Sequence, residues 1–269
     1  TLAFYQLYAG IDSVDTAALL SRTVSQNEFD RWITSRTASV TATVDKAFGE
    51  YDLTRAVRTI ADFVVNDVSN WYVRLNRRRF WGSENNDDKL DAFATLAKTL
   101  LAVSKLAAPA APFFADHSYR ELMGSAADDG HHAVSVHLTS FPAMDEAAID
   151  RALEERMAAA QEVVSLGRAA RAKTRLKTRQ PLAEAVVIIP GNWNKDVLDP
   201  VRALVEAELN VKRLSVRESL EGIGALTMKP NFAVLGSRIG QRMKELQKVV
   251  AAWDTKTAEQ YCRTQRASV

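Results

Sequence analysis

One stretch of the chain, from Leu53 to Trp81, constrains the fold more than any other. Its apolar residues recur at spacings of three, four and seven, which is the period of one face of an α-helix. These residues are Val57, Ile60, Ala61, Val64, Val68, Trp71 and Leu75. A helix of this length needs other helices to cover its apolar stripe. Glycine (11 residues) and proline (7 residues) are scarce, so we expect a mainly α fold.

Similar patterns on both sides of this stretch predict further helices. The expected helices are TLAFYQLYAGID, Asn27 to about Phe48 with Asn27 as the N-cap, Asp88–Ala107, Pro112–Met123, and Asp145 to about Thr174. Between them VSVHLTSFP (134–142) alternates apolar and polar residues and predicts a short extended segment. The first 165 residues therefore predict an antiparallel helix bundle.

The pattern changes after about residue 165. Three short segments predict strands: LKTRQPL (176–182), AEAVVIIP (183–190) and LNVKRLSV (209–216). Helices are expected at about Lys195–Glu208 and Ser237–Trp253. We thus expect two domains, a helical domain over 1–165 and a junction with a small α+β domain over 166–269.

Composition excludes several classes of protein. The formal net charge is only +2, so any binding of nucleic acid must come from local clusters of basic residues. The single Cys262 excludes an internal disulfide or a four-cysteine zinc site, and we expect an intracellular protein. His131 and His132 have no carboxylate or cysteine at ligand spacing, so we expect no metal site. We expect no membrane span, and the start lacks the pattern of a signal peptide, which suggests that residue 1 is a cut within a longer chain.

The sequence NWYVRLNRRRFW (70–81) combines four arginines with four large aromatic residues. On a helix, Arg74, Arg77 and Arg78 fall about a quarter-turn from the apolar stripe, on the face that also carries Asn70. Guanidinium and amide donors on one face suit phosphate oxygens. The alternative is ion pairing with acids of a neighbouring helix, for example Asp45, Glu50 or Asp52. Arg79 projects nearer the apolar side, so we expect it to be a structural ion-pair partner.

A second basic run, GRAARAKTRLKTRQPL (167–182), contains no acid. Its cations are Arg168, Arg171, Lys173, Arg175, Lys177 and Arg179. If residues 176–182 are extended, Lys177 and Arg179 point to the same side. The run is either a solvated charged surface or a track for a polyanion.

Several segments together resemble isoleucyl-tRNA synthetases, which are class I aminoacyl-tRNA synthetases. The order TLAFYQLYAGID, RWITSRT, NDVSNWYVRLNRRRFW, APAAPFF, VSVHLTSFP, RLKTRQPL, AELNVKRL and KPNFAVLGSRIG is similar to theirs over nearly the whole chain. The valyl and leucyl enzymes share the helical bundle, but RQPL and KPNFAVLG fit the isoleucyl family better. The catalytic His-Ile-Gly-His and Lys-Met-Ser-Lys-Ser motifs of the family are absent from this sequence.

The resemblance implies a tRNA-binding, C-terminal portion of a ligase that joins isoleucine to its tRNA. It implies ATP and Mg²⁺ as requirements of the whole enzyme, no cofactor or catalytic residue in this portion, and a monomeric cytoplasmic protein. The tRNA-binding residues that we expect are Asn70, Arg74, Arg77, Arg78, Arg171, Arg175, Lys177 and Arg179. Two alternatives are the matching portion of a valyl or other related synthetase, and a non-catalytic helical scaffold whose arginines are structural.

Overall fold

The structure is a computed structural model of the whole chain. It describes residues 1–23, 25–82, 86–124, 132–189, 195–218, 228–232, 235, 239–254, 257–258 and 260–261. The chain forms two compact units, Thr1–Glu154 and Glu155–Val269. Our expected boundary near residue 165 lies a few turns further along the same helix and stays a proposal.

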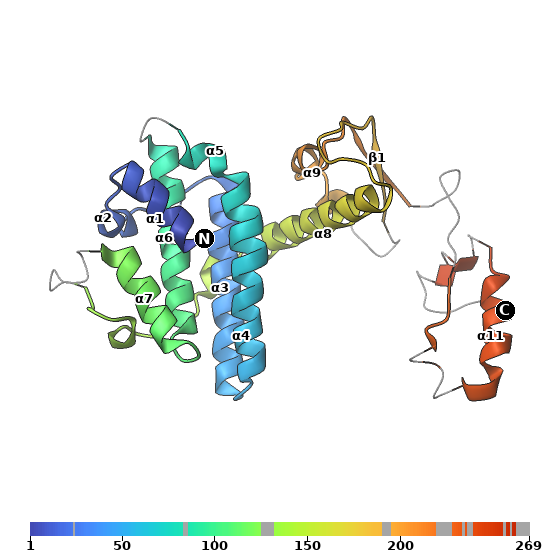
Figure 1. The fold of residues 1–269 in the computed structure, drawn as a ribbon, viewed down its shortest axis with the longest axis horizontal. Helices are drawn as coiled ribbons and strands as arrows, with labels where there is room; N and C mark the ends of the chain where they lie inside the picture. Colours follow the sequence, from blue (N-terminus) through green and yellow to red (C-terminus); the bar gives the residue numbers. More distant parts are fainter. Residues whose placement is uncertain are drawn as a thin grey trace. The chain divides into compact units, whose positions relative to one another are not determined.

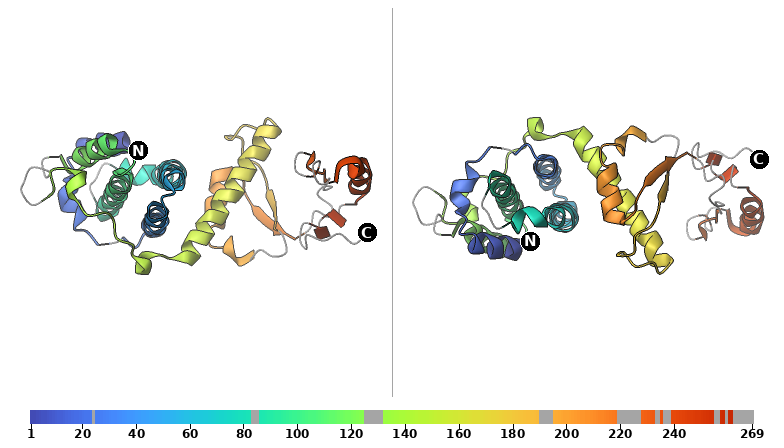
Figure 2. Two further views of the ribbon diagram at one scale, coloured as in Figure 1. Left: turned by 90° about the horizontal axis from the view of Figure 1, so that it is seen from below. Right: turned by 90° about the horizontal axis from the view of Figure 1, so that it is seen from above.

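The first unit is a bundle of helices (Figure 1), which confirms the mainly α expectation. Its elements are α1 (Leu2–Ile11), α2 (Thr16–Leu20), α3 (Glu28–Gly49), α4 (Leu53–Asp62), the π-helix η1 (Phe63–Val73), α5 (Arg77–Phe80), α6 (Asp87–Ala107) and α7 (Pro112–Met123). Helix α6 packs against α2, α3 and α7, and α3 also packs along α4. Figure 2 views these helices nearly end-on.

Side-chain caps and a proline set the starts of the long helices. The Oδ1 atom of Asn27 accepts a hydrogen bond from the backbone N–H of Phe29 at 2.9 Å, which confirms the predicted N-cap of α3. Asn86 caps α6 in the same way, through the N–H of Lys89 at 2.9 Å. Pro112 opens α7, where a helix does not need its missing N–H.

The core of the first unit combines aliphatic and aromatic side chains. Trp32 and Ile33 of α3 are buried, as are Phe80 of α5 and Phe93 of α6. The rings of Phe80 and Phe93 pack edge to face with centroids 5.1 Å apart. Helix α5, which carries the arginines, is thus joined to the core at its last residue.

We expected one α-helix over Leu53–Trp81. The structure instead has three segments there, α4, η1 and α5. In η1 the helix is wider than an α-helix, so the 3.6-residue period that we applied does not hold there. Val68 and Trp71 are buried as predicted, whereas Val57 and Ala61 of the expected stripe are exposed. Those two residues line an apolar groove of about 530 Å³ between α4, α6 and α7.

The prediction of an extended segment at 134–142 is wrong. Val136–Leu138 instead form a 3₁₀ turn capped by Ser135. The Ser135 hydroxyl and the Val136 N–H donate to Asp116 of α7, at 2.5 and 3.0 Å. These two bonds fasten the segment to α7. The other carboxylate oxygen of Asp116 forms an ion pair with the Nε atom of Arg120 at 2.8 Å.

The helix expected from Asp145 begins later than predicted. Glu146–Ala148 form a 3₁₀ turn, and α8 runs over Arg151–Lys173. Asp150 accepts from the N–H of Leu153 at 3.0 Å, so this residue, and not Asp145, caps the long helix.

The second unit contains a small parallel sheet. Strand β1 (Ala185–Ile188) pairs with β2 (Leu214–Arg217), with Ala185 opposite Leu214. The connection between the strands includes α9 (Arg202–Leu209), which contacts β2. The strands predicted in AEAVVIIP and LNVKRLSV are therefore present, although β2 starts only after Asn210 has taken a left-handed conformation at the end of α9.

The prediction of a third strand, at LKTRQPL (176–182), is wrong. Residues 178–180 form turns, and only Leu182 makes an isolated bridge, to Val211. Pro181 has no N–H to donate to a ladder. Carbonyls of this segment also bind a guanidinium, as described below.

The two remaining helices are shorter than predicted. A 3₁₀ turn at Lys195–Val197 and the break at Pro200 precede α9, and α11 covers Met243–Ala251 after a 3₁₀ turn at Gly240–Arg242. Cys262 and His131 lie outside the described residues. Among the described helices, none combines the length and the apolar character that a membrane crossing requires.

Candidate nucleic-acid interface

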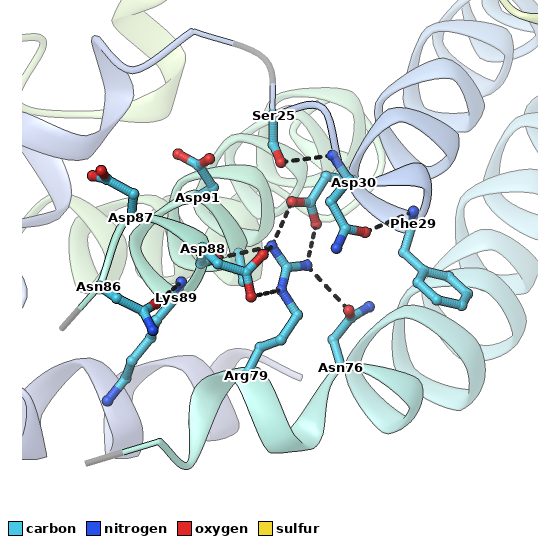
Figure 3. A network of polar contacts seen from close by, with 12 residues as sticks. Ser25, Phe29, Asp30, Asn76, Arg79, Asn86, Asp87, Asp88, Lys89 and Asp91 are labelled. Carbon is cyan, nitrogen blue, oxygen red and sulfur yellow. Dashed lines mark hydrogen bonds and ion pairs between the residues drawn. The ribbon is translucent and has the colours of Figure 1, made fainter. Parts of the chain in front are cut away.

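Arg79 is the inward-facing member of the arginine cluster of α5. Its Nη1 and Nη2 atoms each donate to one oxygen of Asp30, both at 2.8 Å (Figure 3). Its Nε atom donates to Asp88 at 3.0 Å, and Nη1 also donates to the Asn76 side chain at 3.1 Å. Asp30 is completely buried. The prediction that Arg79 is a structural ion-pair partner is confirmed.

The surroundings of Arg79 keep it charged. Burial alone would lower the pKa of its guanidinium, but the hydrogen bonds with Asp30 and Asp88 outweigh that effect and raise the pKa above its usual value. The hydroxyl of Tyr72 donates to Asp30 at 2.6 Å. Burial, followed by the charge of Asp30, raises the pKa of Tyr72 well above its ordinary value, so it remains a neutral donor.

Arg77 and Arg78 face solvent on the same short helix. Within the part of the chain that the structure describes, neither side chain makes an ion pair or a hydrogen bond. The acids proposed as alternative partners lie elsewhere: Glu50 is 3.8 Å from Arg55, and Asp52 caps α4. In the sequence, the whole of α4 and η1 lies between these two acids and α5.

Asn70 and Arg74 lie on η1 and just after it. The Nε atom of Arg74 donates to the carbonyl of Asn70 at 2.7 Å, and the Arg74 side chain is half-buried and has a further interaction. The amide of Asn70 is exposed. The structure thus places all four predicted residues toward the C-terminal end of the η1–α5 segment: Asn70, Arg74, Arg77 and Arg78. Arg74 is half-buried, and the other three are exposed.

The second basic run divides into buried and exposed cations. Arg171 is only 5% exposed and donates to four backbone carbonyls, and Arg168 pairs with Glu208 at 2.5 Å. Lys173, Arg175, Lys177 and Arg179 are exposed. No ion pair involves these four side chains among the described residues. Most of the run is therefore available to a polyanion.

The end of α8 shapes this exposed group. The N–H of Leu176 donates to the carbonyl of Arg171 at 2.9 Å, and the N–H of Arg175 donates to that of Ala172 at 3.1 Å. This pair of bonds is a Schellman motif, and its left-handed position is held by Arg175 with φ of 57°. Glycine is the usual residue there, so a charged side chain is retained at some conformational cost.

Sequence reasoning missed the partners that position these arginines. Asp30 lies three residues before Ile33 on the buried face of α3, and a carboxylate in line with an apolar stripe requires a buried cation. The Arg36 guanidinium between Asp67 and Glu154, at 3.2 and 3.0 Å, is a comparable network that spacing alone did not reveal. Among the described residues, no group of three or more potential ligands could hold a metal ion.

The comparison with protein families agrees with this geometry. Residues 30–188, more than half of the chain, match the family described as "Anticodon-binding domain of tRNA ligase". The chain belongs to this family. The matched range includes η1 and α5 with their arginines, the whole of α8 and the exposed basic turn after it.

Three similar proteins from different bacteria are each named isoleucine–tRNA ligase. The chain is 41% identical over 252 residues to isoleucine–tRNA ligase of Porphyromonas gingivalis, covering 94% of this chain and 22% of that protein. It is 40% identical over 251 residues to isoleucine–tRNA ligase of Cytophaga hutchinsonii, covering 93% and 22%. For isoleucine–tRNA ligase of Clostridium acetobutylicum the values are 38% over 252 residues, 94% and 24%. The chain thus spans less than a quarter of the length of these relatives.

Proposed function

We propose that this chain is the tRNA-binding portion of an isoleucine–tRNA ligase. The observation that carries the proposal is the identity of about two residues in five, over nearly the whole chain, to proteins of that name. The whole enzyme would join isoleucine to its tRNA with ATP and Mg²⁺. This portion would supply affinity for the anticodon arm and no catalytic residue.

The exposed cations support RNA as the partner. Arg77 and Arg78 in the first unit, and Arg175, Lys177 and Arg179 in the second, have solvent-exposed side chains. Proteins read A-form RNA mainly by shape and by contacts with its phosphates and 2′-hydroxyls. We propose that the first unit binds the anticodon stem in this way, with Asn70 and Arg74 beside the two exposed arginines. The second unit would bind close to the anticodon loop.

Arg171 has a different part in this proposal from the one that the sequence suggested. Its guanidinium is buried and both of its Nη atoms donate to carbonyls, so neither Nη atom is available to a phosphate in this conformation. We propose RNA contact for its exposed neighbours. We also propose that the protein is cytoplasmic and monomeric.

Titration with three RNAs tests the proposal. The chain should bind transcribed isoleucine tRNA more tightly than valine tRNA, and both more tightly than a duplex of equal charge. A preference for valine tRNA would favour the portion of a valyl enzyme. Equal and weak binding of all three RNAs would favour a structural scaffold and contradict the proposal.

A further inference from the structure

The guanidinium of Arg171 joins two segments that lie about thirty residues apart in the chain. Its Nη1 atom donates to the carbonyls of Lys177 and Gln180, both at 3.1 Å. Its Nη2 atom donates to those of Leu209 and Asn210, at 2.7 and 3.1 Å. We call Arg171 with these four carbonyls the Arg171 clamp.

The charge of the clamp is compensated without an acid. Within the described residues, no carboxylate pairs with Arg171. Leu209 is the last residue of α9 and Asn210 is its C-cap, where the partial negative charge of the helix dipole is concentrated. Arginine is the one side chain that can serve both pairs of carbonyls, because its donors lie on separate nitrogens in a fixed plane.

Further bonds hold the same two segments together. The side-chain amide of Asn210 donates to the carbonyl of Thr178 at 3.1 Å. The N–H of Lys212 donates to Leu182 at 2.9 Å, and that of Leu182 donates to Asn210 at 3.1 Å. The turn that carries Lys177 and Arg179 is therefore fixed against the connection from α9 to β2.

This arrangement brings one more exposed cation to the basic turn. Lys212 lies two residues after the clamped Asn210, and its side chain is exposed. We infer that Arg171 is a positioning residue, whose clamp assembles Arg175, Lys177, Arg179 and Lys212 into one surface for the RNA sugar–phosphate backbone. The inference rests on the proposed function in its choice of RNA, and it adds Lys212 as a contact.

The first experiment compares Arg171→Met with Arg168→Met in the 269-residue chain. Both variants lose one positive charge from α8, but Arg168 pairs with Glu208 and makes none of the hydrogen bonds of the clamp. A triple variant, Arg175→Gln with Lys177→Gln and Arg179→Gln, removes the surface charges. Isoleucine tRNA and valine tRNA are titrated against each protein at several salt concentrations.

The triple variant should lower the slope of log affinity against log salt by roughly two to three, since each of the three lost phosphate contacts contributes about 0.7–0.9. Arg171→Met should lower the slope by a similar amount, and Arg168→Met should change it little. Lys212→Gln should lower it by about one. Adding Arg171→Met to the triple variant should cause a further loss no larger than that of Lys212→Gln, because Lys212 is the one proposed contact that the triple variant keeps.

A second measurement does not depend on RNA. Trypsin cleaves after Arg175, Lys177 and Arg179, and the clamp should protect these sites. Arg171→Met and Arg171→Lys should speed cleavage there about tenfold or more at unchanged helical circular dichroism. Lysine keeps the charge but donates from one nitrogen, so an effect of charge alone would leave Arg171→Lys protected. If Arg171→Met fails to fold, Asn210→Gly tests the same turn, since it removes the bond to Thr178 at a left-handed position that glycine tolerates.

Two results would overturn the inference. A clamp variant that melts lower while its folded fraction keeps the wild-type salt slope and cleavage pattern would make Arg171 merely structural. An additive loss in the triple background would make Arg171 itself an RNA contact. Equal binding of both tRNAs with the expected slopes would remove isoleucine specificity from the proposed function and leave the clamp intact.

Discussion

At the scale of single residues, neighbouring arginines of the short helix α5 lie in opposite environments, one largely buried in the bundle and two exposed to solvent. Arg79 enters the bundle and forms a bidentate pair with the buried Asp30. Arg77 and Arg78 remain in solvent. The ion pair between Arg79 and Asp30 fixes the helix that carries the exposed Arg77 and Arg78. Substitutions at these neighbouring arginines should therefore separate an effect on stability from an effect on RNA binding.

Replacing Arg77 and Arg78 together by alanine should weaken tRNA binding with little loss of stability. Exposed side chains of this kind contribute about 1 kcal/mol or less to folding. The slope of log affinity against log salt should fall by up to roughly two. Melting curves and tRNA titrations at two salt concentrations measure both effects. A variant that melts much lower but binds with the wild-type slope would show that the pair is structural.

Asp30→Ala should have the reverse effect. It leaves the buried guanidinium of Arg79 without its bidentate partner, which costs about 3–5 kcal/mol in comparable buried pairs. Urea unfolding measures this loss. Asp88→Ala is the matched control, because Asp88 is 56% exposed and should cost less than about 1 kcal/mol. Similar losses for the two variants would argue against the central place of Asp30.

Arg175→Gly should weaken RNA binding without destabilising the fold. Glycine relieves about 1 kcal/mol of left-handed strain, and its extra freedom in the unfolded chain costs about 0.4–1 kcal/mol. The melting temperature should therefore stay the same or rise slightly while affinity for tRNA falls. Arg179→Gly, in the same turn but without a positive φ, is the comparison. A clear drop in the melting temperature of Arg175→Gly alone would contradict this account.

At the scale of elements, side-chain bonds decide what the segments between helices become. The 3₁₀ turn at Val136–Leu138 depends on Asp116 of α7. The Ser135 hydroxyl, followed by the N–H of Val136 and the side chain of Arg120, lowers the pKa of the Asp116 carboxyl below its usual value. A single acid thus links this turn to the bundle.

The lowered pKa of Asp116 predicts a pH dependence of stability. A carboxyl whose pKa is lower in the folded state contributes stability above its unfolded pKa, about 3.9, and loses it as the pH falls through the folded value. Asp116→Asn should therefore make stability less dependent on pH below about 4. Urea unfolding at pH 6 and pH 3 measures this, with Asp145→Asn as the control. An unchanged difference between the two pH values would contradict the prediction.

The helices were predictable from the sequence, and the segments between them were not. Asn27 and Pro112 mark the starts of α3 and α7 locally, but the period of three to four residues overestimated the lengths of later helices, since α8 begins only at Arg151 and α11 covers only Met243–Ala251. The apolar pattern did not distinguish the π-helical η1 from an α-helix, and the turn at 176–182 depends on a partner distant in sequence, Asn210, which no local pattern reveals. The same holds for the interface: the basic residues were evident, but whether each is buried, as Arg171 is, depends on tertiary contacts.

At the scale of the whole molecule, the chain corresponds to less than a quarter of the length of the relatives that it matches. Its match to an anticodon-binding family covers both the arginine helix and the basic turn. Its relatives are more than four times as long as the matched part. Under the proposed function, RNA binding and the ligase chemistry lie on different parts of the protein.

The chain alone should not catalyse isoleucine-dependent exchange of pyrophosphate into ATP. It lacks a glycine-rich phosphate loop and the two catalytic motifs of the family that it resembles. An exchange assay with the purified chain measures this, and a full-length isoleucine–tRNA ligase serves as the positive control. Exchange above the background of a mock preparation would contradict a purely binding role.

The π-helical segment η1 has a consequence for how such an interface can change. Because it lies between α4 and the arginines of α5, its extra residues per turn set the direction in which those arginines face. Losing one residue within 63–73 would rotate the helix after it by roughly a quarter of a revolution. Arg77 and Arg78 would then be redirected without a change in either flanking sequence, provided that the contacts of Arg79 with Asp30 and of Phe80 with Phe93 are formed anew. Insertions and deletions, and not only substitutions, would then be a route by which this surface adapts to a differently shaped RNA.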